Sequence, residues 1–291
     1  MISACYLLNL FMGCLMSKKA WPFPWPEDQI AHYTAYRVDA PLTIDGHLNE
    51  SAWQAAPKSP RFRDLVNGDE VIHDTRTAVL WDDDYLYVGY WIEEPMVTAT
   101  LTERDQPIYQ NNDVELFIAG KDTYYEFEIN AFGTIYEVFF IWEEAYEKGG
   151  FDRMPEFDRT KEGVLPFHGV GFQPHPRGPR IGYWNWDFLD LQTAVHVDGE
   201  INNEKVRDRG WTVELALPWQ GMTSLARDGR SLPPAEGDIW RMDFSRFNQY
   251  KEAPPSRDTS AWAWSPHGTM DSHVPEVWPF IHFSNELVGE R

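Results

Sequence analysis

The feature that most constrains the fold is a series of short segments in which apolar and polar residues alternate. The motif NDVELFIAG points one set of side chains to one side and a second set to the other: Val114, Leu116 and Ile118 against Asp113, Glu115 and Phe117. A period of two is that of a strand with one buried face. Strand-like segments recur at 77–94, 124–142, 191–199, 210–219, 239–248 and 277–284, whereas helix-like patterns are confined to 47–56, where Asn49 is a possible cap, and 219–226. The pattern predicts an all-β chain, an antiparallel β-sandwich of two sheets with a jelly-roll or immunoglobulin-like architecture.

Residues 143–190 interrupt this pattern. They are rich in Gly, Pro, Arg, His and aromatic residues and show little periodicity. Long irregular segments in compact domains are often functional, so we expect an insertion within one domain that spans residues 21–291. Its basic cluster at 177–186 can contact an acidic sugar, but the favoured interpretation is that Arg177 and Arg180 pair with the protein's own carboxylates.

Residues 1–20 contain an apolar run with the chain's two cysteines, Cys5 and Cys14. The run has the length of a signal peptide and is too short to span a membrane comfortably. Met16 also begins an ordinary N-terminal sequence, so a signal peptide and a mis-started leader both remain open. The apolar run favours an extracellular or cell-surface location over the cytoplasm. Since residues 21–291 lack cysteine, we expect neither disulfides nor a cysteine-based zinc site there.

The charge balance restricts the partners. Lys and Arg number 25 against 46 Asp and Glu, a formal net charge of -21. Such a field repels nucleic acids and anionic membranes but is compatible with neutral sugars and metal cations. Aromatic residues make up 15% of the chain, with 14 Trp, more than a core usually contains, and some rings are therefore candidates for a binding surface. Nucleotide-binding, serine-hydrolase and zinc-protease motifs do not occur. We expect a monomer.

Eight short motifs, in order and spacing, resemble carbohydrate-binding module family 9, within the DOMON-like β-sandwiches. They begin with PLTIDGHLNESAW at 41–53 and continue with VLWDDDYLYVGYWIEEP, NNDVELFI, YYEFEINAFGTIYE, GWTVELALPW, EGDIWRMDFSRF, AWAWSPHG and HVPEVWPFIHF, which together cover most of residues 36–284. The resemblance implies two antiparallel sheets and a glycan held between two aromatic rings. It also implies polar side chains on the sugar hydroxyls and, in some members, structural calcium.

The resemblance assigns candidate roles to individual residues of this sequence. The first ring is Tyr109 and the second is Trp264, with Trp262 as the alternative. Glu115 is the carboxylate of its strand, and Glu128 takes a hydrogen-bonding position at which the family can have a basic residue. Asn130, on the same strand face as Glu128, completes the predicted carbohydrate-binding residues: Tyr109, Glu115, Glu128, Asn130, Trp262 and Trp264.

The chemistry of these residues suits a sugar, because aromatic rings cover its C–H face and carboxylates accept bonds from its hydroxyls. We therefore predict a non-catalytic protein that binds a poly- or oligosaccharide. Three alternatives stay open. Trp264 can be a core residue with Tyr109 in a solvated loop, the paired carboxylates Glu115, Glu126 and Glu128 can belong to a glycan hydrolase, or the aromatic surface can meet another protein.

The sequence contains two candidate sites for calcium. Oxygen donors in loops are its usual ligands, and they cluster at Asp82–Asp84 and around Asp45 and Glu50. Asp also favours turns without any metal. The sequence therefore allows a structural calcium ion without identifying its ligands.

Overall fold

The computed structural model describes residue 23 and residues 25–170, 174–250 and 257–290. The predicted leader, residues 1–20 with both cysteines, lies outside the described residues. Within the described part, no helix is long and apolar enough to cross a membrane.

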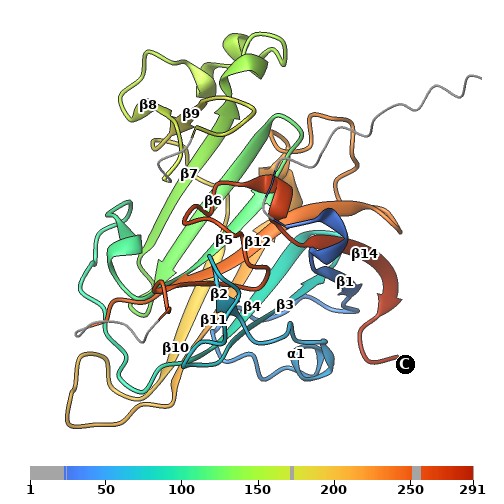
Figure 1. Ribbon diagram of the computed structural model, residues 1–291. Coiled ribbons are helices and arrows are strands. Elements are labelled where there is room, and N and C mark those ends of the chain that lie inside the picture. The colour runs from blue at the N-terminus through green and yellow to red at the C-terminus, as the bar shows by residue number, and fades with distance from the viewer. Residues whose placement is uncertain (1–22, 24, 171–173, 251–256, 291) are drawn as a thin grey trace, which may run out of the picture.

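Fourteen strands of the described residues form two packed sheets that share one strand (Figure 1). In the first sheet the order is β10 (Gln192–Asp198), β11 (Gly210–Pro218), β4 (Tyr85–Glu93), β3 (Thr75–Trp81), β1 (His32–Arg37), β14 (Phe280–Leu287) and β12 (Ile239–Phe247). The second sheet continues from β12 through β5 (Asp113–Ala119), β6 (Thr123–Asn130), β7 (Ile135–Trp142), β9 (Arg180–Tyr183) and β8 (Val164–Phe167). On its other side β12 also pairs with β13 (Ala261–Ala263), which in turn pairs with β2 (Arg63–Asp64).

The shared strand is β12. Its first three residues pair with β14 in the first sheet, and the following six pair with β5 in the second. The predicted β-sandwich is confirmed, and its pairs are antiparallel except that β1 runs parallel to both β14 and β3.

Helical structure is as sparse as the sequence indicates. The helix expected at 47–56 is the short α1 (Ser51–Ala55), whose N-cap is Glu50 rather than Asn49. The segment at 219–226 contains only the 3-10 turn η6 (Trp219–Met222). Further 3-10 turns are η1 (Glu27–Gln29), η2 (Ile108–Gln110), η3 (Glu143–Ala145), η4 (Phe151–Arg153), η5 (Pro155–Phe157) and η7 (Pro275–Val277).

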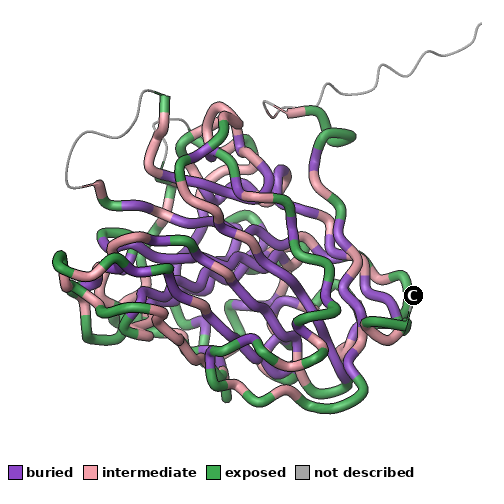
Figure 2. Tube along the Cα trace, turned by 90° about the horizontal axis from the view of Figure 1, so that it is seen from below, coloured by how far each residue is buried: buried purple, intermediate pink, exposed green. Residues whose placement is uncertain are grey.

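The main core lies between the sheets, where one alternate set of each strand's side chains meets the other sheet. Buried residues follow the strands through the interior, while exposed residues gather in the peripheral loops (Figure 2). On β5 and β6 this inward set is Val114, Leu116, Ile118, Tyr125, Phe127 and Ile129. Full burial of each such side chain contributes about 1.5–3 kcal/mol relative to exposure. The alternation read from the sequence therefore also fixes which side chains of β5 and β6 point outward.

The segment 143–190 extends the second sheet. After η3, η4 and η5 it forms β8 and β9, and β9 pairs with β7 at the upper end of the sheet in Figure 1. Arg177 bonds Asp122 at 2.6 Å and Glu144 at 2.9 Å. The favoured interpretation, pairing with the protein's own carboxylates, is thus confirmed for Arg177. Arg180 instead donates to the His273 backbone oxygen at 3.4 Å and lies over the Trp142 and Phe167 rings.

Candidate functional site

A cavity of about 350 Å³ lies on the outer face of the second sheet, the face turned away from the main core. Its position follows from strand alternation, since the inward set of β5 and β6 belongs to the core and the outward set carries the acids. The lining residues come from η2, β5, β6, β7, β12, the 143–190 segment and the 270–273 loop: Tyr109, Glu115, Glu126, Glu128, Tyr136, Phe140, Phe167, Val170, Trp184, Phe247, Met270, Asp271, Ser272 and His273.

Carboxyl groups form the floor of this cavity. Glu115 on β5 stands directly opposite Glu128 on β6 in the antiparallel register, and Glu126 lies two residues from Glu128 on the same strand face. Asp113, two residues before Glu115, completes the group beneath the cavity. All four are buried. They arise from i, i+2 spacing on two neighbouring strands, the pattern that the sequence displays.

Burial dominates the electrostatics of the floor. Burial raises the pKa of Glu115 to about 8, against a lowering hydrogen bond from Ser245. The pKa values of Asp113, Glu126 and Glu128 are also raised well above their usual range, first by burial and then by the neighbouring carboxylates. Burial and mutual repulsion therefore both favour the protonated forms of these acids unless a positive charge is bound among them.

Aromatic rings form the walls. Tyr109 is 45% exposed at the rim, and its backbone N–H donates to Glu128 Oε2 at 2.8 Å, which ties the η2 turn to the floor. Trp184, at the end of β9, donates its indole N–H to the Tyr136 hydroxyl at 2.7 Å. Tyr109 and Tyr136 meet edge to face at 6.2 Å. The cavity thus presents ring surfaces above a carboxyl floor.

The structure places the six predicted residues in three groups. Tyr109, Glu115 and Glu128 line the cavity. Asn130 is fully buried and outside the lining, where its amide group donates to Leu101 O and its oxygen accepts from Phe132 and Thr134 in the turn after β6. The two predicted tryptophans form the third group.

Trp262 and Trp264 both pack into the main core. Trp264 is 6% exposed and contacts Tyr33 and Phe244, while the Arg246 guanidinium lies over the Trp262 ring. The W-A-W spacing does put both rings on one side of the strand, but that side is the core. Neither ring is among the residues that line the cavity.

Several lining residues were not singled out as site residues by the sequence: Tyr136, Phe140, Phe167, Val170, Met270, Asp271 and His273. The sequence points to Trp184 only through the basic and aromatic cluster at 177–186. The available signal was the density of aromatic residues in an aperiodic segment, which indicates a function without indicating which sheet the segment covers.

His273 lies beside the floor in its neutral form. Burial lowers its pKa to about 3, and its Nε2 lies 3.5 Å from Glu126 Oε1. Burial also raises the pKa of Glu126, so the neutral forms of both groups are favoured where they meet. The Tyr124 hydroxyl lies 3.1 Å from Nδ1 of the same histidine.

The donor set of the floor fits a hard cation. Asp113, Glu115 and Glu128 each offer an oxygen, and these oxygens lie within 4.8 Å of one another, the single such group of three or more among the described residues. The sequence candidates at Asp82–Asp84 and around Asp45 and Glu50 do not form such a group. The Asp82 carboxylate instead accepts from Asp84, Tyr85 and Tyr87 in its turn.

Solved proteins with a similar fold include a Bacteroides uniformis protein provisionally described as carbohydrate-binding. It aligns with 15% identity, a TM-score of 0.54 and coverage of 88% of this chain and 100% of the other. At that identity the similarity shows the fold. Two structures of a family 9 carbohydrate-binding module from Caldicellulosiruptor kristjanssonii also align. The glucose complex has 13% identity and a TM-score of 0.47, and the alignment covers 87% of this chain and 97% of the other. The cellotriose complex has 12% identity and a TM-score of 0.48, and the alignment covers 89% of this chain and 97% of the other.

A search of curated proteins found no match. Residues 44–150 match the family model described as carbohydrate family 9 binding domain-like. This range includes β5, β6 and β7 together with Tyr109 and the four carboxyls of the floor, but not Trp184. The chain resembles carbohydrate-binding module family 9 in three respects: the order of its motifs, its sandwich fold and this match.

Proposed function

We propose that this protein binds an oligo- or polysaccharide in the cavity on the outer face of the second sheet. The observation that carries the proposal is the pairing of exposed ring surface with a carboxyl floor in one cavity. Rings cover the apolar face of a pyranose, and carboxyl groups bond its hydroxyls. The match of residues 44–150 to a carbohydrate-binding family model supports the same ligand class.

The two rings of the proposed site are Tyr109 and Trp184. Both line the cavity and come from different elements, the η2 turn and the end of β9. Trp264, the ring implied by the resemblance, is occupied by core contacts, so this proposal assigns its role to Trp184. The sugar hydroxyls would meet Glu115, Glu126 and Glu128 on the floor.

The test is a glycan array followed by calorimetric titration of the oligosaccharide that binds. Trp184→Ala removes one stacking ring, and we expect affinity to fall by about tenfold or more, the equivalent of losing roughly 1.5–3 kcal/mol of apolar contact. Phe132→Ala is the matched control, because Phe132 is also an exposed ring but lies in the turn after β6, outside the cavity lining. Equal affinity of wild type and Trp184→Ala would contradict the assigned site.

Glycan hydrolysis is the second candidate. Its supporting observation is that oxygens of Glu115 and Glu128 lie within 4.8 Å of each other while the pKa of Glu115 is raised to about 8, so that a protonated acid stands beside a second carboxyl group. The same oligosaccharide is incubated with the protein and assayed for new reducing ends. Their appearance, and their loss in Glu128→Gln, would reject a purely binding role.

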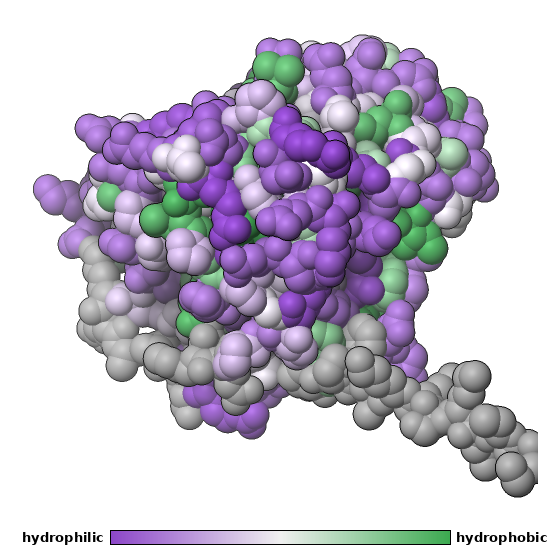
Figure 3. All heavy atoms as spheres, turned by 90° about the horizontal axis from the view of Figure 1, so that it is seen from above, coloured by the Kyte–Doolittle hydropathy of each residue, from purple (hydrophilic) through white to green (hydrophobic). Residues whose placement is uncertain are grey.

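The alternative of a protein-interaction surface receives less support. The face seen from above shows hydrophilic residues predominating, with hydrophobic residues in separate groups (Figure 3). Large contiguous apolar patches mark protein-interaction sites, and the hydrophobic residues on this one face stand in separate groups (Figure 3).

A further inference from the structure

Three carboxyl oxygens converge at the floor of the cavity. Asp113 and Glu115 lie two residues apart on β5 and so share a face, and Glu128 faces Glu115 across the register with β6. The oxygens that these residues offer lie within 4.8 Å of one another. Carboxylates held this close repel one another when ionised, so the arrangement needs either protons or a cation.

One oxygen of this group lacks any partner. Oδ1 of Asp113 accepts a bond from the Phe247 backbone N–H at 3.0 Å, but Oδ2 is buried without a hydrogen-bond partner. The residue itself has no exposed surface. Buried polar atoms are nearly always satisfied by protein, water or an ion. An orphaned, fully buried carboxylate oxygen within a cluster of three acids therefore points to a ligand.

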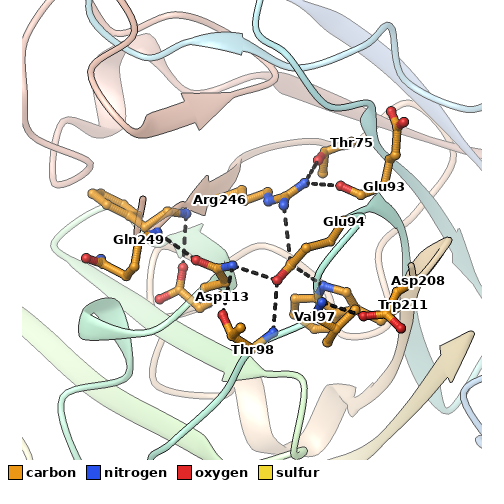
Figure 4. A network of polar contacts seen from close by, with 12 residues as sticks. Thr75, Glu93, Glu94, Val97, Thr98, Asp113, Asp208, Trp211, Arg246 and Gln249 are labelled. Carbon is orange, nitrogen blue, oxygen red and sulfur yellow. Dashed lines mark hydrogen bonds and ion pairs between the residues drawn. The ribbon is translucent and has the colours of Figure 1, made fainter. Parts of the chain in front are cut away.

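No positively charged side chain is paired with these three acids in the described part of the chain. Among the described residues, no Lys, Arg or His forms an ion pair with Asp113, Glu115 or Glu128. The charge of the buried Arg246 guanidinium lowers the pKa of Asp113 somewhat, but its hydrogen bonds point toward Thr75, Glu93 and Glu94 (Figure 4), with the Thr75 hydroxyl at 2.8 Å and Glu94 Oε2 at 3.3 Å. Among the described residues, the three acids thus lack an ion-pair partner.

We infer that Asp113, Glu115 and Glu128 bind a calcium ion, or a divalent cation of similar hardness, at the floor of the cavity. All three donors are oxygens, which hard cations prefer, and softer metals would favour nitrogen or sulfur ligands. Three carboxylates leave several positions of a six- to eight-coordinate ion to other oxygens. Glu115 and Glu128 line the cavity, so those open positions face it.

A consequence for the ligand rests on the proposed function. Paired hydroxyls of a sugar are oxygen donors that can occupy the open positions of the ion. The cation would then supply the positive charge that the resemblance led us to expect from a basic residue at the Glu128 position. Carbohydrate binding would accordingly require the cation.

Terbium luminescence tests the cation site directly. Tb³⁺ substitutes for Ca²⁺ at oxygen sites and is sensitised by nearby rings, which Tyr109, Tyr136 and Trp184 provide. In wild type we expect a saturable signal that Ca²⁺ competes away. Asp113→Asn removes one ligand and should weaken Tb³⁺ affinity by at least about tenfold.

Glu126→Gln is the matched control. Glu126 lies in the same cavity but outside the group of three, so its loss should change affinity less than about fivefold through the general field alone. Absence of a saturable, Ca²⁺-sensitive signal in wild type would overturn the cation site, and that measurement does not depend on how any variant folds. Equal weakening by Asp113→Asn and Glu126→Gln would overturn the ligand assignment.

The same glycan array, run with Ca²⁺ and with EDTA, separates this inference from the proposed function. Terbium binding together with glycan binding that EDTA abolishes supports both parts. Glycan binding that persists in EDTA overturns the role of the ion in ligand binding. Terbium binding without any glycan binding supports the cation site and counts against the proposed function alone.

Discussion

Glu214 on β11 connects the N-terminal part of the fold to the first sheet, and replacing it with Gln tests that connection. Its Oε2 accepts the backbone N–H groups of Asp45 and Gly46 at 3.0 Å each, and its Oε1 accepts the indole N–H of Trp53 at 2.8 Å. Gln keeps the shape but offers only one acceptor oxygen. In Glu214→Gln the new NH₂ group must face either the indole or the two backbone donors.

The expected loss follows from this count. One charge-assisted bond, worth about 1.5–3 kcal/mol, disappears and a buried N–H donor is left unpaired. Burial raises the pKa of Glu214, which means that its charged form is poorly solvated in the fold. Replacing the charge with a neutral amide relieves that desolvation and offsets part of the loss. We expect the free energy of unfolding to fall by about 2 kcal/mol, measured by urea denaturation at pH 7, with Tm lower by roughly 4 °C.

A double-mutant cycle with Trp53→Phe isolates the indole bond. Phe fills much of the Trp53 site but has no N–H. The indole donor that loses its acceptor in Glu214→Gln is therefore absent from the double variant. The two losses should therefore be non-additive by about 1 kcal/mol. A change below about 0.5 kcal/mol in Glu214→Gln, or strict additivity, would refute the account of this carboxylate as a shared acceptor.

Two further predictions concern pH. In EDTA, burial raises the folded-state pKa of Glu115 to about 8, so the folded protein binds a proton that the unfolded chain lacks. The share of Glu115 should therefore stabilise the fold by about 2 kcal/mol as pH falls from 8 to 6.5, and Glu115→Gln should make the slope in urea denaturation shallower by that amount. Burial lowers the pKa of His273 to about 3, so below pH 6.5 the unfolded chain binds a proton that the folded one does not. His273→Gln should therefore lose less stability than the wild type as pH falls from 6.5 to 5. If both proteins lose the same amount of stability over this range, His273 titrates normally.

Much of the fold was predictable because one-sided burial leaves a period of two in the sequence. The hairpin of β3 and β4 and the strands β5, β6, β7, β10, β11, β12 and β14 all overlap the segments that the alternation identified, although β3, β6 and β14 extend one to three residues beyond them. The five strands β1, β2, β8, β9 and β13 did not stand out. β2, β8, β9 and β13 have four residues or fewer, too few to establish a period, and β1 is paired in parallel on both sides.

The candidate site was partly predictable for the same reason. Alternation on β5 and β6 placed Glu115 and Glu128 on one face, and the structure brings them opposite each other. It could not decide between exposure and burial for Trp262 and Trp264, because a ring on one side of a strand looks the same in sequence whether that side faces solvent or core. Only the packing of β13 beside β12 settles it.

The properties of the acid floor depend on a segment distant in sequence from the acids. Phe167, Val170 and Trp184 come from the 143–190 segment and form a wall over the outer face of the second sheet. Without that wall, the acids of β5 and β6 would lie on an open polar face, where water would keep their pKa values near the usual range. The wall and the 270–273 loop enclose the space above the acids, and burial makes unpaired carboxylates costly. The strands alone therefore supply the acids, and the segment that lacked periodicity turns them into a group that requires protons, a cation or a ligand.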